Sequence, residues 1–407
     1  MVTSSTADAV LRQPPLWLLV AISALAPITM NGVLPANTAV MRDFSTDYTA
    51  AQLALTVYLV ASMISQSILG NLADTYGRRP VMIGALTLFG VGGLLCAAAG
   101  SIETLLAGRF VQGFGSSVCV FLTRTILRDV HPKDKAASAI GYMVTAMMVA
   151  PLFGPAVFGW ITDVSSWRIM YLLLAIAGFG LAFLSNRYQQ ETLVVSDKPV
   201  QSHWQSNKAL LTKREFLAYV FIMSGSVGVY YCYLAGAPFV VMELRDHSAT
   251  AYGTWFSLVA IGYLAGNFIA GRFSEACGTQ RMIVLSMVPL IIGVVLFWIF
   301  SGMEHLIGLF LPMQFIALSN GMCLPNLTSA AMSVRTENAA GASGLLGTIQ
   351  IATAIVLTFV VSALLKNTAL PLFILITVCG IASLAGLWLL LDKRSRTWPG
   401  PGHGSDY

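Results

Sequence analysis

The chain has 407 residues, of which 56% are hydrophobic and 10% are charged, and its formal net charge is +5. Soluble domains carry about 25% charged residues, so this composition excludes a cytosolic enzyme with an ordinary surface. The basic residues are spread over many short loops without interleaved aromatic side chains, which argues against nucleic acid as a partner. The composition therefore predicts an integral membrane protein.

Apolar runs of about 20 residues, the length that crosses a hydrocarbon core, recur from end to end. We predict six spans in the first half, near 15–40, 51–70, 80–100, 104–127, 137–160 and 167–185. Six more are predicted near 216–241, 250–270, 282–302, 305–330, 339–364 and 369–391. The expected fold is an all-α membrane protein of twelve transmembrane helices in two six-helix bundles, residues 1–186 and 216–392.

The long polar stretch between the two sets, residues 187–215, is predicted to be a cytoplasmic linker, and residues 393–407 a cytoplasmic tail. Most Lys and Arg residues share one side of the membrane if the N-terminus is inside, so both termini are expected in the cytoplasm. Residues 1–14 are polar and the apolar run after them is long enough to span, so no cleavable signal is expected. The six cysteines lack metal-ligand spacing, and no metal or cofactor is expected.

The loop between the second and third predicted spans carries two glycines, an acid and two arginines, namely Gly70, Asp74, Gly77, Arg78 and Arg79. The glycines permit a tight turn, the acid can attract a helix N-terminus, and the arginines are expected at the headgroups. The glycines and the acid recur at identical spacing in the second half, at Gly271, Glu275 and Gly278. Thr279 and Gln280 stand there in place of the arginine pair. This repeat predicts two similar bundles joined in tandem and a gating role for the loop.

Arg109 lies well inside the fourth predicted span. A guanidinium at that depth costs at least about 2.5–3.5 kcal/mol on insertion scales, so it needs a partner or a water-filled cavity. Gln112 follows three residues later on the same helix face. Two interpretations stay open at this point: a structural arginine bonded to helix carbonyls, or a coupling residue of a transport site.

The fifth predicted span combines prolines that interrupt the helix ladder with glycines that allow close packing, namely Pro151, Gly154, Pro155 and Gly159. We expect a kinked helix packed against the eleventh span, which is equally rich in small residues. Such an interface could limit leakage, although ordinary glycine-rich packing explains the pattern equally well.

These motifs resemble the major facilitator superfamily. Residues 70–79 match its signature loop, residues 108–117 its R-x-x-Q-G element and residues 150–159 the antiporter motif of its drug-exporting branch. Further stretches resemble the Bcr/CflA-like drug:proton antiporters, at residues 123–130, 166–173, 235–241 and 324–350. The resemblance implies the major facilitator fold, multidrug efflux across the inner membrane, protons as the coupling ion and a part for Arg109 in that coupling.

The first span departs from this group at Asn31, where the resembling proteins commonly carry an acid. Asparagine carries no proton across a membrane, and proton exchange normally needs a titratable group in the cavity. No Asp or Glu lies deep in an apolar run, because Glu103, Glu243 and Glu304 fall at predicted external ends. Three explanations stay open: Glu243 lies deeper in the membrane than predicted, or coupling uses Arg109 and the substrate's charge, or coupling is weak. Asp129 is expected to form an ion pair in a loop.

The resemblance implies that spans 1, 4, 7 and 10 line a central path. The candidate cavity residues are rings and amides, namely Asn37, Tyr230, Tyr231, Tyr233, Trp255, Asn320 and Asn326. Helical geometry lets only one or two of the three tyrosines face a cavity, and tyrosines near span ends also anchor to the interface. Such a surface would suit a small amphiphilic substrate.

The leading hypothesis is a monomeric exporter in the lipid bilayer that works by alternating access. A dedicated exporter of one endogenous metabolite, such as a siderophore, or of one antibiotic class is the alternative within transport. A receptor or scaffold of the same fold would normally carry long soluble domains, and an intramembrane enzyme would need paired catalytic residues in a span. No GxxxxGK[ST] motif is present, so ATP is not the expected energy source.

Overall fold

The structure is a computed structural model, and the ranges it describes are 14–130, 149–193, 210–334 and 339–392, with a few helical residues between 131 and 148. Across these ranges every regular element is helical. Eleven helices among the described residues are long and apolar enough to cross a membrane. The fifth predicted span, 137–160, is described from Val149 onward, and its earlier part falls mainly on residues outside the described ranges. The predicted all-α membrane fold is confirmed.

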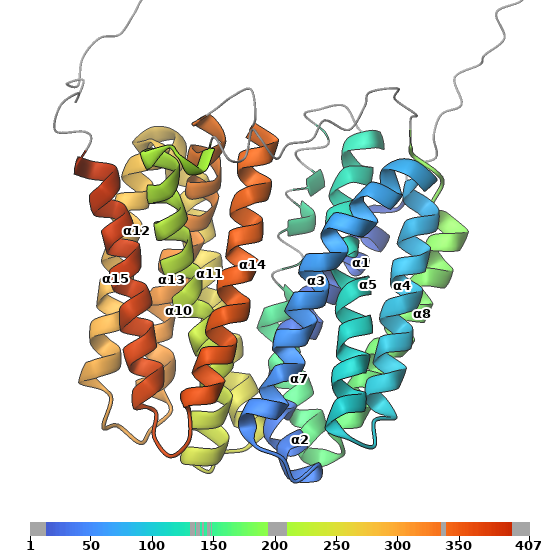
Figure 1. The fold of residues 1–407 in the computed structure, drawn as a ribbon, viewed down its shortest axis with the longest axis horizontal. Helices are drawn as coiled ribbons and strands as arrows, with labels where there is room; N and C mark the ends of the chain where they lie inside the picture. The colour runs from blue at the N-terminus through green and yellow to red at the C-terminus, as the bar shows by residue number, and fades with distance from the viewer. Residues whose placement is uncertain are drawn as a thin grey trace, which may run out of the picture. The chain divides into compact units, whose positions relative to one another are not determined.

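The chain order of the helices follows the predicted spans (Figure 1). The first half contains α1 (Leu16–Asn31), the 3-10 helix η1 (Leu34–Ala36), α2 (Asn37–Asp43), α3 (Tyr48–Tyr76), α4 (Arg78–Ala97), α5 (Ile102–Val130), α7 (Val149–Val164) and α8 (Trp167–Tyr188). The second half contains α10 (Arg214–Phe239), the π-helix η2 (Val240–Leu244), α11 (Ala249–Cys277), α12 (Thr279–Ile299), α13 (Ile307–Ser333), α14 (Ala339–Leu364) and α15 (Leu370–Asp392).

The first predicted span is not one continuous helix. Instead, α1 ends at Asn31 and the chain continues through η1 into α2. Pro35 stands at the start of η1, and because proline has no backbone N–H the regular α-helical ladder is interrupted there. The break lies between Asn31 and Asn37, the two polar residues that the sequence places in this span.

Two compact units divide the described residues. Unit 1 comprises Met1–Pro199, Leu234–Ile261 and Thr358–Ala369, and unit 2 comprises Val200–Tyr233, Gly262–Leu357 and Leu370–Tyr407, as far as their residues are described. This division assigns the end of α10, the start of α11 and the end of α14 to unit 1. The sequence-based division at the linker 187–215 is a different one and stays a prediction.

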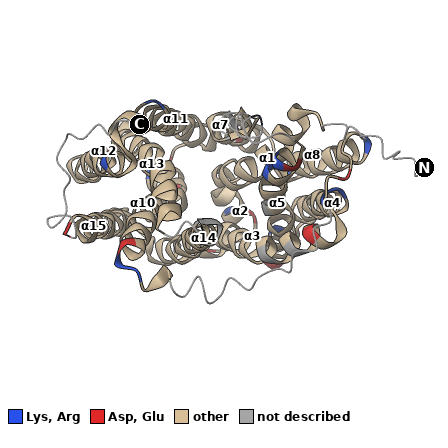
Figure 2. Cartoon of the chain, turned by 90° about the horizontal axis from the view of Figure 1, so that it is seen from above, with Lys and Arg blue, Asp and Glu red and all other residues tan. Residues whose placement is uncertain are grey.

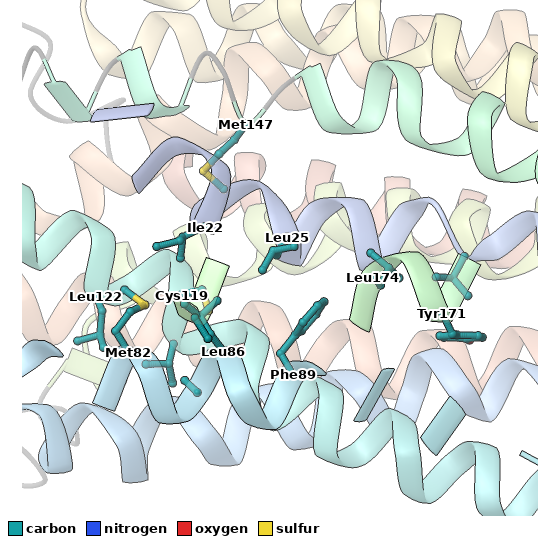
Figure 3. Packing of buried hydrophobic residues seen from close by; sticks show 14 of the residues in the cluster. Ile22, Leu25, Met82, Leu86, Phe89, Cys119, Leu122, Met147, Tyr171 and Leu174 are labelled. Atoms are coloured by element: carbon teal, nitrogen blue, oxygen red, sulfur yellow. The ribbon is translucent and has the colours of Figure 1, made fainter. Parts of the chain in front are cut away.

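The apolar interior of unit 1 is a cluster of side chains from α1, α4, α5 and α8 (Figure 3). In a membrane, helices associate by close packing rather than by the hydrophobic effect, so small residues at contacts matter. A Cβ added to Gly92 of α4 would collide with the backbone of Gln112, and one on Gly115 of α5 would collide with the carbonyl oxygen of Ala85. This close approach of α4 and α5 fixes the position of the helix that carries Arg109.

Charged side chains are sparse along the helices, most of whose length carries neither an acidic nor a basic residue (Figure 2). Among the described residues, the charged side chains classed as buried are Arg78 and Arg109. Every described Asp and Glu is exposed or half-buried. The two arginines therefore mark the two polar sites of unit 1.

Candidate functional site

The first site is centred on Arg109, which is only 1% exposed within α5. Its Nε donates to the carbonyl oxygen of Ala54 in α3 at 3.1 Å, and its Nη1 donates to Oε1 of Gln112 at 2.7 Å. The predicted pair of Arg109 and Gln112 is thus brought together by the three-residue helical spacing. Both hydrogen-bond acceptors are neutral.

Two aromatic rings complete the surroundings of this guanidinium. Its Cζ lies 4.4 Å from the ring centroid of Tyr58 in α3 and 5.8 Å from that of Tyr171 in α8. Cation–π contacts of this kind stabilise a desolvated cation by up to about 2 kcal/mol. The Tyr58 hydroxyl in turn accepts a hydrogen bond from Ser116 at 2.6 Å. Sequence reasoning missed both tyrosines, because each comes from another helix and no spacing within α5 identifies it.

Two buried amides, one in α3 and one in α5, have donors without acceptors among the described residues. Gln52 and Gln112 are both 0% exposed, and the Nε2 atom of each has no hydrogen-bond partner among the described residues. The Oε1 of Gln52 accepts from Nδ2 of Asn37 at 2.5 Å, so this predicted cavity residue is tied to α3. An unsatisfied buried donor costs about 1–3 kcal/mol, so these two Nε2 atoms are candidates for contact with a hydrogen-bond acceptor.

The other polar residue of the first span, Asn31, is 2% exposed and donates from Nδ2 to the carbonyl oxygen of Pro27 in its own helix at 3.0 Å. Glu243, considered above as a deep acid, lies in η2 and forms an ion pair with exposed Arg42 at 2.9 Å. Because this half-buried carboxylate pairs with an exposed arginine, the structure does not support the explanation that Glu243 is a deep acid. The two explanations that remain are coupling through Arg109 with substrate charge, and weak coupling.

The other cavity candidates are divided between the two units. Trp255 is half-buried in unit 1, while the three tyrosines and the remaining two asparagines belong to unit 2. Tyr233 is fully buried and packs edge-on against Phe310, at 5.9 Å between ring centroids, so it is a packing residue of unit 2. Tyr230 and Tyr231 contact each other edge-to-face at 5.4 Å, and both stay candidates for a cavity.

The two asparagines of α13 are buried in unit 2. Asn326 donates to the carbonyl oxygen of Met322 in its own helix at 2.8 Å. Asn320 donates to the carbonyl oxygen of Ser226 in α10 at 3.2 Å, and its Oδ1 has no hydrogen-bond partner among the described residues. Asn320 is therefore the stronger of these two candidates for contact with a bound molecule.

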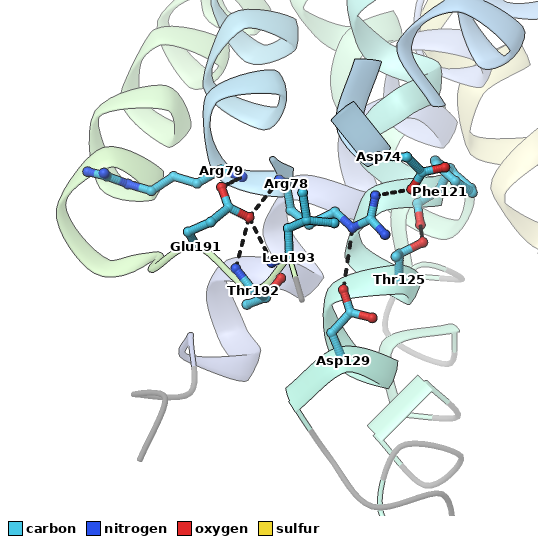
Figure 4. Close-up of polar contacts among 9 residues, drawn as sticks. All are labelled: Asp74, Arg78, Arg79, Phe121, Thr125, Asp129, Glu191, Thr192 and Leu193. Carbon is cyan, nitrogen blue, oxygen red and sulfur yellow. Dashed lines mark hydrogen bonds and ion pairs between the residues drawn. The ribbon is translucent and has the colours of Figure 1, made fainter. Parts of the chain in front are cut away.

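The second polar site of unit 1 is the loop that joins α3 to α4, where Arg78 contacts two carboxylates (Figure 4). Its Nη1 pairs with Asp74 and its Nε lies 3.4 Å from Oδ2 of Asp129 at the end of α5. The side chain of Arg78 is buried in this network, and its expected position at the depth of the headgroups stays a prediction. Asp74 pairs with Arg78 rather than with a helix N-terminus, and Asp129 forms the expected ion pair, with Arg78 as its partner.

A residue that the sequence analysis did not single out completes this network. Glu191, three residues beyond α8, accepts hydrogen bonds from the backbone N–H of Arg78 and Arg79 at 2.8 and 3.1 Å. The N–H groups of Thr192 and Leu193 donate to the same carboxylate. Burial alone would raise the pKa of Glu191, but these four hydrogen bonds outweigh it and lower the pKa below the usual value. Glu191 therefore acts as an N-cap of α4 supplied from the predicted linker.

The glycines and Arg79 shape the same loop. Gly77 adopts a φ of 105°, where a side chain is strained, and a Cβ there would collide with the carboxylate of Glu191. Gly70 lies within α3, where an added Cβ would make an ordinary contact with Phe121. Arg79 donates from Nη2 to the side chain and backbone of Asn186 at 2.9 and 2.7 Å. The tight-turn role of Gly77 is thereby explained by its backbone conformation.

The glycine- and proline-rich helix of the fifth span, α7, packs closely within unit 1. A Cβ on Gly159 would collide with the carbonyl oxygen of Ala249 at the start of α11, and Gly154 lies near Gly32 of the first span. Pro151 and Pro155 both lie within α7. The predicted partner, the eleventh span, corresponds to α14, of which residues up to Leu357 belong to unit 2. That pairing stays a prediction.

Comparison with known proteins gives the family. The family model described as "Major Facilitator Superfamily" matches residues 16–356. The chain is 28% identical to "Uncharacterized MFS-type transporter YdgK" of Bacillus subtilis (strain 168), over 93% of this chain and 95% of that protein. It is 26% identical to "Multidrug resistance protein D" of Escherichia coli (strain K12), over 93% and 96% of the two chains.

The solved structures that resemble this fold are also transporters. A peptide transporter, POT, in complex with sulfate aligns with a TM-score of 0.75 at 13% identity, over 97% of this chain and 99% of that chain. At this identity the likeness shows the fold alone. The extent of the family match nevertheless confirms the resemblance drawn from the loop motifs. This multi-pass membrane transporter belongs to the Major Facilitator Superfamily.

Proposed function

We propose that this protein exports small amphiphilic compounds, including drugs, across the inner membrane by alternating access, as a monomer with both termini in the cytoplasm. The observation that carries the proposal is Arg109, a buried guanidinium at membrane depth that is held by Ala54, Gln112 and two tyrosine rings. Ionisable residues inside membrane helices are costly and typically mark transport pathways.

The direction of transport is supported by the relatives. Proteins named "Multidrug resistance protein D" and, at 26% identity over 86% of this chain and 84% of its length, "Chloramphenicol resistance protein" of Pseudomonas aeruginosa align with this chain. Resistance by a membrane transporter implies outward movement of the compound. We extend this direction to the present chain.

The energy source in this proposal is the proton-motive force, with protons as the coupling ion. Exchange for protons requires a group that titrates during the cycle, and no carboxylate is buried among the described residues. The pH component and the electrical component of the force therefore need separate tests. In vesicles, each is imposed alone while the movement of a transported compound is followed.

The experiment that tests the proposal is an efflux assay in cells that lack other drug pumps. We expect the wild-type chain to lower the accumulation of at least one amphiphilic compound, and Arg109→Ala to abolish most of that effect because the site loses its buried charge. Arg187→Ala, at the exposed end of α8, is the matched control and should behave as wild type. Unchanged efflux by Arg109→Ala at equal protein level would contradict the assigned site.

A further inference from the structure

Among its described residues, the interior of unit 1 contains positive charge without a buried negative partner. Arg109 is 1% exposed, whereas every Asp and Glu in the described ranges is exposed or half-buried. The carboxylates nearest the ends of α2, α3 and α7 are engaged there. Asp43 pairs with Arg168, Asp47 caps α3, and Asp163 accepts from the backbone of Thr250. None of these groups neutralises the guanidinium in the interior.

The groups that contact Arg109 do not neutralise its positive charge. The carbonyl oxygen of Ala54 and the Oε1 of Gln112 satisfy two of its donors, and the rings of Tyr58 and Tyr171 face its Cζ. All four are neutral groups, so they solvate the cation without cancelling its field. An arginine stays protonated in proteins, so this field persists at any physiological pH.

Two buried amide donors of unit 1 lack an acceptor among the described residues. The Nε2 atoms of Gln52 and Gln112 are buried and without hydrogen-bond partners among the described residues. The orientation of Gln112 is fixed chemically, because an arginine only donates and so must face the amide oxygen, which leaves Nε2 as the free atom. An unsatisfied N–H donor on the amide that holds the cation, with a second one on Gln52 of α3, suits a group that accepts hydrogen bonds and carries negative charge.

The magnitude of this effect is large enough to select substrates. At a separation of about 10 Å and an effective dielectric constant of about 20, one unit charge changes the binding constant of an ion by roughly tenfold. The charge of Arg109 strengthens the binding of an anion and weakens the binding of a cation. The ratio of the two binding constants therefore changes by the product of the two factors. Direct contact with Arg109 is not required for this selection.

We propose that the compounds moved by this transporter are anionic amphiphiles, with a carboxylate or similar acceptor group, and that organic cations are rejected. This inference rests on the proposed export function and names its substrate class. An inside-negative membrane potential is the electrical component of the proposed proton-motive force and drives anions outward, so it adds to proton exchange in the export of such a compound. No buried acid among the described residues would oppose the binding of an anion.

The test uses two hydrophobic ions of nearly equal size and opposite charge, tetraphenylborate and tetraphenylphosphonium. Their binding to the purified full chain in lipid nanodiscs is measured by titration calorimetry, with empty nanodiscs subtracted. We expect tetraphenylborate to bind at least about tenfold more tightly than tetraphenylphosphonium. Equal or tighter binding of the cation, or binding of neither ion, would overturn the inference.

Two variants test whether the ratio of the anion's binding constant to the cation's depends on the charge of Arg109. Gln112→Glu keeps the shape of the side chain and places a carboxylate against Nη1, so it should reduce the ratio toward one while retaining the fold. Arg109→Gln should do the same by removing the charge. Gln190→Glu, which adds an equal charge at an exposed position after α8, should leave the ratio unchanged. An unchanged ratio in Gln112→Glu would also overturn the inference.

The cellular efflux assay separates the two possible failures. If neutral amphiphiles are exported and the cation binds as tightly as the anion, only the charge selection is wrong. If no compound of any charge is exported or bound, the proposed function fails together with the inference.

Discussion

The loop after α3 and the loop after α11 share a backbone conformation at the glycine turn but differ in the side chains that surround it. Each follows a helix of 29 residues and turns at a glycine of positive φ, which is 105° for Gly77 and 85° for Gly278. A Cβ on Gly77 would collide with the carboxylate of Glu191, whereas one on Gly278 would have no described atom within 4 Å. The turn therefore requires glycine in both copies, while the polar network belongs to the first copy.

Among the described residues, the second loop shows no counterpart of the contacts that carboxylates make with Arg78 and the α4 amides. Glu275 is exposed there, and Thr279 takes the place of the arginine that joins two carboxylates in the first loop. Gln280 has a buried Oε1 with no hydrogen-bond partner among the described residues. The comparison indicates that a shared turn geometry is independent of the ion pairs, which can be tested by changing one feature at a time.

The largest effect is expected from alanine at the two glycines. Both substitutions place a side chain in a backbone region that favours glycine, at a cost of about 1–3 kcal/mol in the free energy of unfolding. Gly77→Ala also displaces Glu191 from the α4 amides, and losing a cap costs about 1 kcal/mol more. Thermal unfolding of the detergent-solubilised protein should therefore show a lower Tm for Gly77→Ala than for Gly278→Ala. Equal losses would show that the contact with Glu191 contributes nothing.

A smaller effect, of about 1 kcal/mol, is expected from Glu191→Gln, because the charged cap of α4 becomes neutral. The pKa of Glu191 is lowered on folding, so the unfolded chain binds more protons just below the usual value of 4.5. Its contribution to stability is therefore full above that value and is lost as pH falls through the lowered pKa. The Tm difference between wild type and Glu191→Gln should shrink over that range.

The matched control for this pH dependence is Glu275→Gln in the second loop, where the exposed acid caps no described helix. We expect a small Tm difference that does not vary with pH. A constant difference for Glu191→Gln as well would contradict the capping role.

The sequence predicted the features that repeat or follow a period, and it missed those that depend on contacts between distant segments. The spans, the doubled turn and the deep position of Arg109 all follow from local pattern. The cap by Glu191 joins residues more than a hundred positions apart, within a stretch that reads as a polar linker, so no spacing could indicate it. Tyr58 and Tyr171 were missed for the same reason. The burial of Arg78 was missed because a basic residue beside a span is by default expected to face the headgroups.

The smallest expected effect comes from rebuilding one contact of the first loop in the second. Thr279→Arg places a guanidinium four residues after Glu275, which is the spacing of Asp74 and Arg78. The pair would join the end of α11 to the start of α12, and an exposed ion pair contributes about 0.2–1 kcal/mol. A basic residue at the start of α12 offsets part of this gain through the helix dipole. A double-mutant cycle with Glu275→Gln isolates the pair energy from the dipole cost. A pair energy near zero would mean that Arg78 owes its position to Asp129 and to its burial against α5, and not to the neighbouring acid that both loops retain.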